Sequence, residues 1–388
     1  KMPRFKTKDD GENERRVNCE GDNGQLPMKT NSNSGVTAYN SSDSNFPKVA
    51  IIILNWNGWQ DTIECLESLQ RITYPNYQII VVDNGSTDDS IEKIKAWARG
   101  EIPVESKFFE YNPDNKPVQW IEYARQTAET GGIPEEEAKL AELPVSRRII
   151  LIQTGGNLGF AGGNNVGIKY ALLRKYSYLC LLNNDTVVDP KFLDFFVQHI
   201  ESDRSLGIVG GKIYKYNEIK CLWYAGGHIS LLGRGPGYVM HHSESNKLSS
   251  VSFVTGCLML LRADVLNKVG LLDPYLFFGG EDADLCLRTI KAGFKIDYEP
   301  RAIIWHKIAQ TYDKYSLSHI YYVYRGKVTF TRKHLPLVFW YMWLIAFILY
   351  LLIFAGPRQL FRTKSIKVAL NTVVGGLSAI RDVIRRLD

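Results

Sequence analysis

The hydrophobic pattern of the first half of the chain alternates between short, continuous apolar runs and stretches in which apolar residues recur at helical spacing. Continuous runs are typical of strands buried on both faces of a parallel sheet, and they occur at Val49–Leu54, Gln78–Val82, Arg148–Gln153 and Tyr178–Leu182. Helical spacing follows at 61–69, at 89–98 and, after a glycine-rich stretch, up to about 175. The alternation predicts an α/β domain whose first half is a Rossmann-like arrangement that binds a nucleotide.

Residues 100–147 interrupt this rhythm with several prolines and two helix-like pieces, around Trp120–Glu129 and Glu135–Ala141. A connection of this length in a compact α/β domain is usually a functional insertion or a lid. We therefore interpret residues 100–147 as an insertion and assign no chemistry to them.

The second half of the domain has shorter strand-like runs separated by glycine-punctuated loops. These runs are Ile208–Val209, Leu222–Tyr224, Val251–Val254, Cys257–Leu261, Phe294–Tyr298 and Ala302–Trp305. Such runs predict a mixed sheet rather than further βαβ units, and acceptor sites are often built on the loops of such a sheet. Together the two halves predict one domain at residues 47–330.

The two ends of the chain differ from this domain. Residues 1–46 are rich in Asn, Ser and Gly and predict a disordered tail. The C-terminal segment, residues 331–388, begins with the uncharged run Leu335–Ala355, which predicts a membrane-associated helix, and continues as a basic tail. At about 1.5 Å per residue this run is long enough to cross a hydrocarbon core of about 30 Å. The alternative is a helix that lies in one leaflet, which Pro336 and the basic flanks favour.

Charge and cysteine usage refine the picture of the partners and the compartment. The chain has 388 residues and a formal net charge of +6, and the excess lies in its C-terminal end. A basic tail beside an apolar run indicates an anionic membrane surface rather than nucleic acid. The six cysteines form no C-x-x-C pair, which indicates a reducing compartment and a catalytic domain on the cytoplasmic side.

The turn Gly279–Gly280 precedes a predicted helix whose first turn carries three carboxylates: Glu281, Asp282 and Asp284. Leu285 anchors this helix, and Gly293 ends it. Acids at a helix start also complement the helix dipole, and Asp284 is spaced to pair with Arg288 one turn later. From this stretch alone, a catalytic and a structural role are equally plausible.

Polar side chains follow the predicted strands of the first half. Asp83 ends the second strand, where open α/β sheets bind ligands, and Asn183–Asn184–Asp185 ends the fourth. An Asp with neighbouring amide oxygens suits Mg²⁺ or Mn²⁺ that carries a diphosphate. The alternative at both places is an Asx turn. Thr255–Gly256 either faces the acceptor pocket or forms a buried turn.

Seven segments, in this order and spacing, resemble inverting family 2 glycosyltransferases with a GT-A fold, especially the rhamnosyltransferase-like branch. They are Ile53–Asn57, Val82–Asp88, Asn157–Asn164, Leu182–Asp185, Gly280–Leu285, His306 and Tyr321–Arg325. The resemblance covers about Lys48–Lys327.

The resemblance implies a role for most of the candidate residues. The donor nucleotide-sugar would be contacted by Asn55, Asp83, Asn157, Gly163, Asn183 and Asn184. Asp185 stands in the family's Asp-x-Asp metal motif, of which it is the only carboxylate, and His306 would complete the metal site. Asp282 would be the general base, with Glu281, Thr255 and Gly256 beside the acceptor.

We therefore predict a membrane-associated enzyme that transfers one sugar, with inversion, from a nucleoside-diphosphate sugar to a lipid-linked or glycan acceptor. A processive polysaccharide synthase is an alternative, although a Q-x-x-R-W signature is missing after the central helix and the sequence has one hydrophobic run. The pattern also leaves open a nucleotidyltransferase and a catalytically inactive, membrane-bound scaffold that binds nucleotide-sugars.

Overall fold

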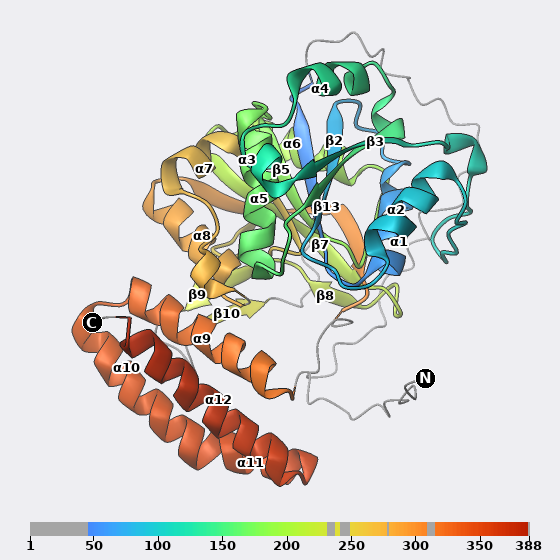
Figure 1. Ribbon diagram of the computed structural model, residues 1–388. Coiled ribbons are helices and arrows are strands. Elements are labelled where there is room, and N and C mark those ends of the chain that lie inside the picture. Colours follow the sequence, from blue (N-terminus) through green and yellow to red (C-terminus); the bar gives the residue numbers. More distant parts are fainter. Residues whose placement is uncertain (1–45, 231–236, 241–248, 278, 309–314, 387–388) are drawn as a thin grey trace.

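The computed structural model describes residues 46–230, 237–240, 249–277, 279–308 and 315–386. The predicted N-terminal tail, apart from Phe46, lies outside these residues. The centre of the molecule is one large mixed sheet with helices on both faces, and a layer of C-terminal helices lies against one side of this α/β body (Figure 1).

The first half of the sheet is parallel, as the continuous apolar runs predict. Its strands are β1 (Val49–Asn55), β2 (Tyr77–Asp83), β4 (Arg148–Gln153) and β5 (Tyr178–Asn183). They lie in the order β5-β1-β2-β4, and the helices that follow β1, β2 and β4 are α1 (Trp59–Leu69), α2 (Ser90–Arg99) and α5 (Gly159–Leu173). The register sets Asn55 opposite Asp83, so the carboxyl ends of β1 and β2 meet at one edge.

The insertion extends the sheet instead of forming a separate lid. Its elements are β3 (Gln119–Ala124), α3 (Arg125–Glu129), α4 (Pro134–Ala141) and two 3₁₀ turns, Pro113–Asn115 and Val145–Arg147. The helix predicted around Trp120–Glu129 is therefore wrong in its first half, because β3 pairs in parallel with β4 as the edge strand. Trp120, Ile121 and Tyr123 are residue types that favour a pleated, half-buried strand.

The second half is a mixed sheet, as predicted. Its elements are β6 (Thr186–Val188), α6 (Phe192–Ser202), β7 (Leu206–Lys215), β8 (Leu222–Tyr224), β9 (Gly227–Ser230), β10 (Gly237–Met240), β11 (Ser249–Ser250), β12 (Leu258–Arg262), α7 (Ala263–Val269), the 3₁₀ turn Pro274–Leu276, α8 (Glu281–Lys291) and β13 (Lys295–His306). β12 is antiparallel to both β5 and β7, whereas β13 runs parallel to β7. The predicted α/β class, with a parallel first half and a mixed second half, is confirmed.

Three of the predicted short strands in this half need correction. Val251–Val254 contains only an isolated bridge at Phe253. Phe294–Tyr298 and Ala302–Trp305 belong to the single strand β13, because a register shift between Glu299 and Ile303 lets the chain pass Pro300 without leaving the sheet.

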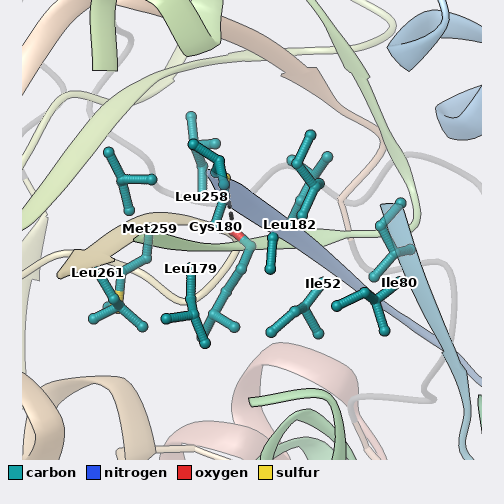
Figure 2. Packing of buried hydrophobic residues seen from close by; sticks show 14 of the residues in the cluster. Ile52, Ile80, Leu179, Cys180, Leu182, Leu258, Met259 and Leu261 are labelled. Carbon is teal, nitrogen blue, oxygen red and sulfur yellow. Dashed lines mark hydrogen bonds between the residues drawn. The ribbon is translucent and has the colours of Figure 1, made fainter. Parts of the chain in front are cut away.

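The core lies between the sheet and its helices and is made largely of β-branched and leucine side chains. Figure 2 shows Ile52, Ile80, Leu182, Leu258 and Met259 packed together, and each of them is at most 2% exposed. These residues come from both the parallel and the mixed half, so one continuous core joins the two halves of the sheet.

The C-terminal segment is helical almost throughout. It contains α9 (Leu317–His334), α10 (Leu337–Tyr350), a π-helical turn (Leu351–Ala355), α11 (Gly356–Thr363) and α12 (Ile366–Ile384). Leu337–Thr363 forms one helix that is long and apolar enough to cross a membrane. The predicted hydrophobic helix is thus present and extends beyond Ala355, and the predicted basic tail is the amphipathic helix α12.

A buried ion pair fastens the insertion to the first βαβ unit. The Glu67 carboxylate on α1 accepts hydrogen bonds from Lys116 Nζ (2.8 Å), Asn115 Nδ2 (2.9 Å) and Trp97 Nε1 (2.9 Å). The side chain of Glu67 is fully buried and that of Lys116 is 5% exposed. Removal of one partner would leave the other buried without its counter-charge.

We expect Glu67→Gln to lower the free energy of unfolding by about 3–5 kcal/mol, because the buried Lys116 ammonium loses its partner. Urea titration followed by circular dichroism measures this change. The double variant Glu67→Gln/Lys116→Met should be more stable than the single one, since it removes both charges. A double variant that is less stable than the single one would contradict this assignment.

Candidate functional site

The first cluster of polar residues lies where β1 and β2 end. Asn55 Nδ2 donates to Asp83 Oδ1 (2.8 Å), and the hydroxyl of Ser86 donates to the same oxygen (2.6 Å). Asn55 is fixed in turn by the Thr62 hydroxyl, which donates to Asn55 Oδ1 (2.8 Å). The predicted residues Asn55 and Asp83 are therefore brought together. The Asx turn through Ser86 is also present, because the Ser86 amide donates to Asp83 Oδ2 (3.0 Å).

The glycine-rich stretch packs against this cluster through Asn84. Asn84 Nδ2 donates to Asn157 Oδ1 (3.2 Å), and Asn84 Oδ1 accepts from the Leu158 amide (3.0 Å). The Asn157 side chain also accepts from the Gly159 amide (2.8 Å) at the start of α5. Asn157 is exposed, and a Cβ added at Gly155 would meet nothing within 4 Å, so this part of the stretch is open to a ligand.

Gly163 occupies a different position from the open part of the stretch. A Cβ added there would lie 2.5 Å from Leu54 Cδ1 and 3.0 Å from Asn84 Oδ1. The absence of a side chain at Gly163 therefore lets α5 approach the ends of β1 and β2. Sequence reasoning did not single out Asn84, whose importance depends on contacts with residues more than 70 positions away.

A second cluster forms at the end of β5. Asp185 Oδ1 lies 3.0 Å from His306 Nε2 at the end of β13, and both residues are buried. The predicted pair of Asp185 and His306 is thus brought together from positions far apart in the chain. Asn184 turns toward α1 instead, where its Nδ2 donates to the Thr62 hydroxyl (3.0 Å) and so connects the second cluster to the first. The Asn183 backbone carbonyl accepts from the Thr186 hydroxyl (2.7 Å), which closes the turn.

The third cluster is the start of α8. Gly280 precedes it in a left-handed conformation (φ 95°), which a side chain would strain. Asp282 Oδ1 accepts from the Ala283 amide (2.8 Å), and Asp282 Oδ2 accepts from the Gly256 amide (3.2 Å). Gly256 therefore lies beside the candidate base, as one of the two sequence interpretations expected. Thr255 Oγ1 accepts from the Cys257 amide (3.4 Å), so these residues also form a turn.

Burial changes the protonation of the two acids that open α8. Burial raises the pKa of Asp282 to about 6, against the opposing effect of the hydrogen bonds from Gly256 and Ala283. Burial and the charge of Asp282 also raise the pKa of Glu281, whose Oε2 is buried without a hydrogen bond among the described residues. At neutral pH the pair therefore carries its negative charge mainly on Asp282.

The loop 255–257 connects the candidate base to the Asp185–His306 pair. The Gly256 amide holds Asp282, and the thiol of the next residue, Cys257, lies beside His306. A Cβ added at Gly256 would also approach the Phe160 ring to 3.0 Å, so the glycine-rich stretch reaches the same place. The second and third clusters and the glycine-rich stretch thus meet at one loop, although they come from both halves of the domain.

The third acid of α8 has a different environment from the first two. The Asp284 side chain is fully buried and pairs with Arg288 Nε (2.8 Å), Lys333 Nζ (2.9 Å) and His334 Nε2 (2.8 Å). Burial opposes ionisation, but the hydrogen bonds from His334 and Lys333 and the charge of Arg288 outweigh it and lower the pKa of Asp284 to about 2. The sequence predicted the pair with Arg288, whereas the partners on α9 were not foreseen.

This network should make the stability of the protein depend on acid pH. Because the pKa of Asp284 is lower in the folded than in the unfolded state, its contribution is present above about pH 4 and is lost as the pH falls toward 2. We expect Asp284→Asn to cost about 2 kcal/mol at pH 7 and the difference from the parent chain to shrink below pH 4. Chemical denaturation at several pH values measures this.

A matched control is Glu92→Gln on α2, which removes an exposed carboxylate that pairs with Lys95 and should change the free energy of unfolding little at either pH. A cost for Asp284→Asn that is equal at pH 7 and pH 2.5 would contradict the electrostatic assignment.

Among the described residues, no three His, Cys, Asp or Glu side chains are grouped to hold a metal ion. Two donors are adjacent, however, because the carboxylate of Asp185 faces the imidazole of His306 at 3.0 Å. Oxygen and imidazole ligands suit Mg²⁺ or Mn²⁺, and a bound diphosphate would supply further oxygens. The pair therefore fits a cation that is shared with the substrate.

Comparison with known proteins identifies the domain. Residues 50–116 match the family model described as glycosyl transferase family 2, and residues 137–319 match the one described as glycosyltransferase like family 2. These ranges contain most of the candidate residues, from Asn55 to His306.

Curated relatives share part of their length with this chain. A poly-beta-1,6-N-acetyl-D-glucosamine synthase of Staphylococcus epidermidis is 22% identical over 269 residues, which are 68% of this chain and 50% of the relative. Hyaluronan synthase 2 of Rattus norvegicus is 24% identical over 62% of this chain and 42% of its own length. A pre-mycofactocin glycosyltransferase of Mycobacterium tuberculosis is 28% identical over 38% of this chain and 30% of the relative. The chain thus spans half or less of the length of these relatives.

Solved structures show a more distant likeness. GalNAc-T7, solved with UDP, GalNAc and Mn²⁺, aligns with a TM-score of 0.49 and 15% identity over 73% of this chain and 48% of its own. The mannosyltransferase PcManGT of Pyrobaculum calidifontis, solved with GDP-Man and Mn²⁺, aligns with a TM-score of 0.46 and 13% identity over 89% of this chain and 80% of its own.

Proposed function

The chain belongs to glycosyltransferase family 2, and from this premise we propose that it transfers a single sugar from a nucleoside-diphosphate sugar to a hydroxyl of a lipid-linked or glycan acceptor, with inversion at the anomeric carbon. The observation that carries the proposal is the position of Asp282. Its carboxylate is held by two backbone amides beside the loop that also contacts the Asp185–His306 pair.

Asp282 is proposed to act as the general base. Its raised pKa still leaves the carboxylate ionised at neutral pH, and it makes the carboxylate a better proton acceptor than an exposed Asp. The acceptor hydroxyl gives its proton to Asp282 while its oxygen attacks the anomeric carbon from the side opposite the departing diphosphate. A single displacement of this kind inverts the configuration.

The donor is proposed to lie along the ends of β1, β2 and β5. Asp83, held by Asn55, would contact the nucleotide base, and the exposed Asn157 would contact the nucleotide-sugar. Asn183 and Asn184 position the turn that carries Asp185. A divalent cation at Asp185 and His306 would offset the charge that develops on the leaving diphosphate. Thr255, Gly256 and Glu281 would border the acceptor.

We expect Asp282→Asn to lower the transfer rate by a factor of about 10²–10⁴ or more, because the acceptor hydroxyl loses its proton acceptor. Calorimetric binding of UDP-, GDP- and dTDP-sugars in the presence of Mn²⁺ should be nearly unchanged, since Asp282 is assigned no donor contact. The matched control is Asp189→Asn, because Asp189 lies between β6 and α6 and is assigned no role in the reaction. This variant should retain activity. Full turnover by the Asp282 variant would rule out this base.

The pH dependence of kcat/KM offers a separate test. Because the base acts only when it is ionised and burial raises its pKa, the acid limb should fall below about pH 6 with a slope of one. An exposed Asp would place this limb near pH 4. Initial rates at saturating metal between pH 4.5 and 8 measure it, and a limb near pH 4 would contradict a buried Asp282 base.

A processive polysaccharide synthase is a second candidate, because two of the relatives named above are polysaccharide synthases. The two activities differ in the length of the product. Mass spectrometry of the product formed with excess donor should show addition of one sugar under our proposal, whereas a ladder of longer products would favour the synthase.

We also propose that the enzyme acts at a membrane, with its catalytic domain on the cytoplasmic side. The apolar helix Leu337–Thr363 supports membrane association. The described cysteines are all buried and form no disulfide with one another, which agrees with a reducing compartment.

A further inference from the structure

The helices after His334 expose an unusually large apolar surface. The side chains that protrude most are Val338 (70% exposed), Met342 (62%), Ile345 (62%), Phe354 (63%), Phe361 (89%) and Ile366 (68%). Single exposed apolar residues are ordinary, but a continuous apolar surface over several helices marks a place that another molecule covers. We call this surface the apolar face of α10–α12.

The opposite sides of these helices pack tightly within the molecule. A Cβ added at Gly375 on α12 would lie 2.9 Å from Ile320 Cγ2 on α9, and one added at Gly376 would lie 2.5 Å from Leu351 Cδ1 in the π-helical turn. These two glycines let α12 approach both neighbours closely. Figure 1 shows the result, in which α10, α11 and α12 run beside α9 as one layer.

The layer is fastened to the catalytic domain through α9. Arg325 Nη2 donates to the Tyr275 carbonyl (2.9 Å), and the Phe277 and Tyr322 rings stack with their centroids 4.5 Å apart. Lys333 and His334 hold Asp284 at the first turn of α8. The long helix α10–α11 therefore lies alongside the domain and does not project away from it.

We propose that α10, α11 and α12 lie in the plane of the membrane, embedded in one anionic leaflet by their apolar face, and do not cross the bilayer. This inference rests on the proposed function at a membrane and specifies how the membrane is met. A crossing by α10–α11 would carry its packed neighbour α12 into the hydrocarbon core. Asp382 and Arg381 of α12 would be buried there, although Asp382 is bound to Tyr321 of α9 (2.6 Å).

The charges of the layer point to the same arrangement. Exposed basic residues occur at both ends of α12: Arg358, Arg362, Lys364 and Lys367 near its start, and Arg381, Arg385 and Arg386 near its end. Asp382 is the only acidic residue between positions 356 and 386. Cations at both ends of a helix can reach the same row of anionic headgroups only when the helix lies flat.

A flat layer would also set the position of the catalytic base. Because α9 joins the layer to Asp284, two residues after Asp282, the start of α8 would remain at a fixed height above the headgroups. That arrangement suits an acceptor whose reacting hydroxyl is carried by a lipid in the same leaflet.

The experiment uses the full chain bound to the outside of vesicles that contain phosphatidylglycerol. Lys367→Cys places a thiol in the first turn of α12, just after the long helix α10–α11 ends. Lys139→Cys on α4 is a matched control in the catalytic domain, and both positions are exposed. A membrane-impermeant maleimide is added outside, with the unsubstituted chain as background. A flat layer predicts that both thiols are labelled to the same extent before and after detergent.

Protection of Lys367→Cys until detergent opens the vesicles would overturn the proposal, because it would place this residue across the bilayer. A chain that does not bind the vesicles, and instead forms a dimer in which the apolar face is buried, would overturn it as well. Binding should fall at least tenfold on vesicles of phosphatidylcholine alone. Transfer to an acceptor in detergent is unaffected by either failure, so the catalytic proposal is tested separately.

Discussion

The hydrogen bond from the Gly256 amide to the Asp282 carboxylate is the contact on which the arrangement of the site depends. It joins the start of α8 to the loop before β12, and the next residue of that loop, Cys257, lies beside His306. A buried carboxylate needs such donors to stay ionised, because without them burial would raise its pKa further and favour the neutral acid. The same contact therefore keeps Asp282 ionisable and fixes its position relative to Asp185. As a result, α8 and the ends of β5 and β13 meet at one loop.

The first turn of α8 shows how three neighbouring acids acquire different properties from their surroundings. Asp284 faces the cations of α8 and α9, and its pKa is lowered. Asp282 meets only backbone amides, and Glu281 has a buried oxygen without a partner among the described residues, so both pKa values are raised. The helix dipole acts on all three and cannot explain the difference. The division follows from burial and from which side chains reach each carboxylate. Asp284 is held in ion pairs, whereas Asp282 is free of them among the described residues and is the acid that we propose as the base.

Much of the fold could be predicted because its signals are local. The runs at β1, β2, β4 and β5 are apolar on both faces, so their sequences specify central parallel strands. Edge strand β3 shows only weak alternation of buried and exposed residues. Although Trp120, Ile121 and Tyr123 favour a strand, its assignment depends on pairing with β4, which the local sequence does not show. The β-bulge that joins two predicted strands into β13 likewise arises from the pairing of β13 with β7. It could not be predicted from the residues of β13 alone.

The candidate site was predictable to the extent that its residues stand at strand ends and at a helix start. Asn55 and Asp83, and likewise Asp185 and His306, do meet in space. Asn84, Cys257 and His334 were missed because each is recognised by a partner that is distant in sequence. No local pattern distinguishes such a residue from an ordinary polar one. Which base, sugar and acceptor are used likewise depends on the shape of the pocket and not on a motif.

The stereochemistry of the reaction tests the central claim most directly, because a base on the acceptor side of the sugar requires a single displacement. Proton NMR can follow the first sugar that the enzyme releases to water from an α-linked nucleoside-diphosphate sugar, before the anomers equilibrate. The account predicts that the β-anomer appears first, through attack of water assisted by Asp282. Initial release of the α-anomer would contradict it, since retention cannot result from one displacement in which the nucleophile attacks opposite the leaving diphosphate.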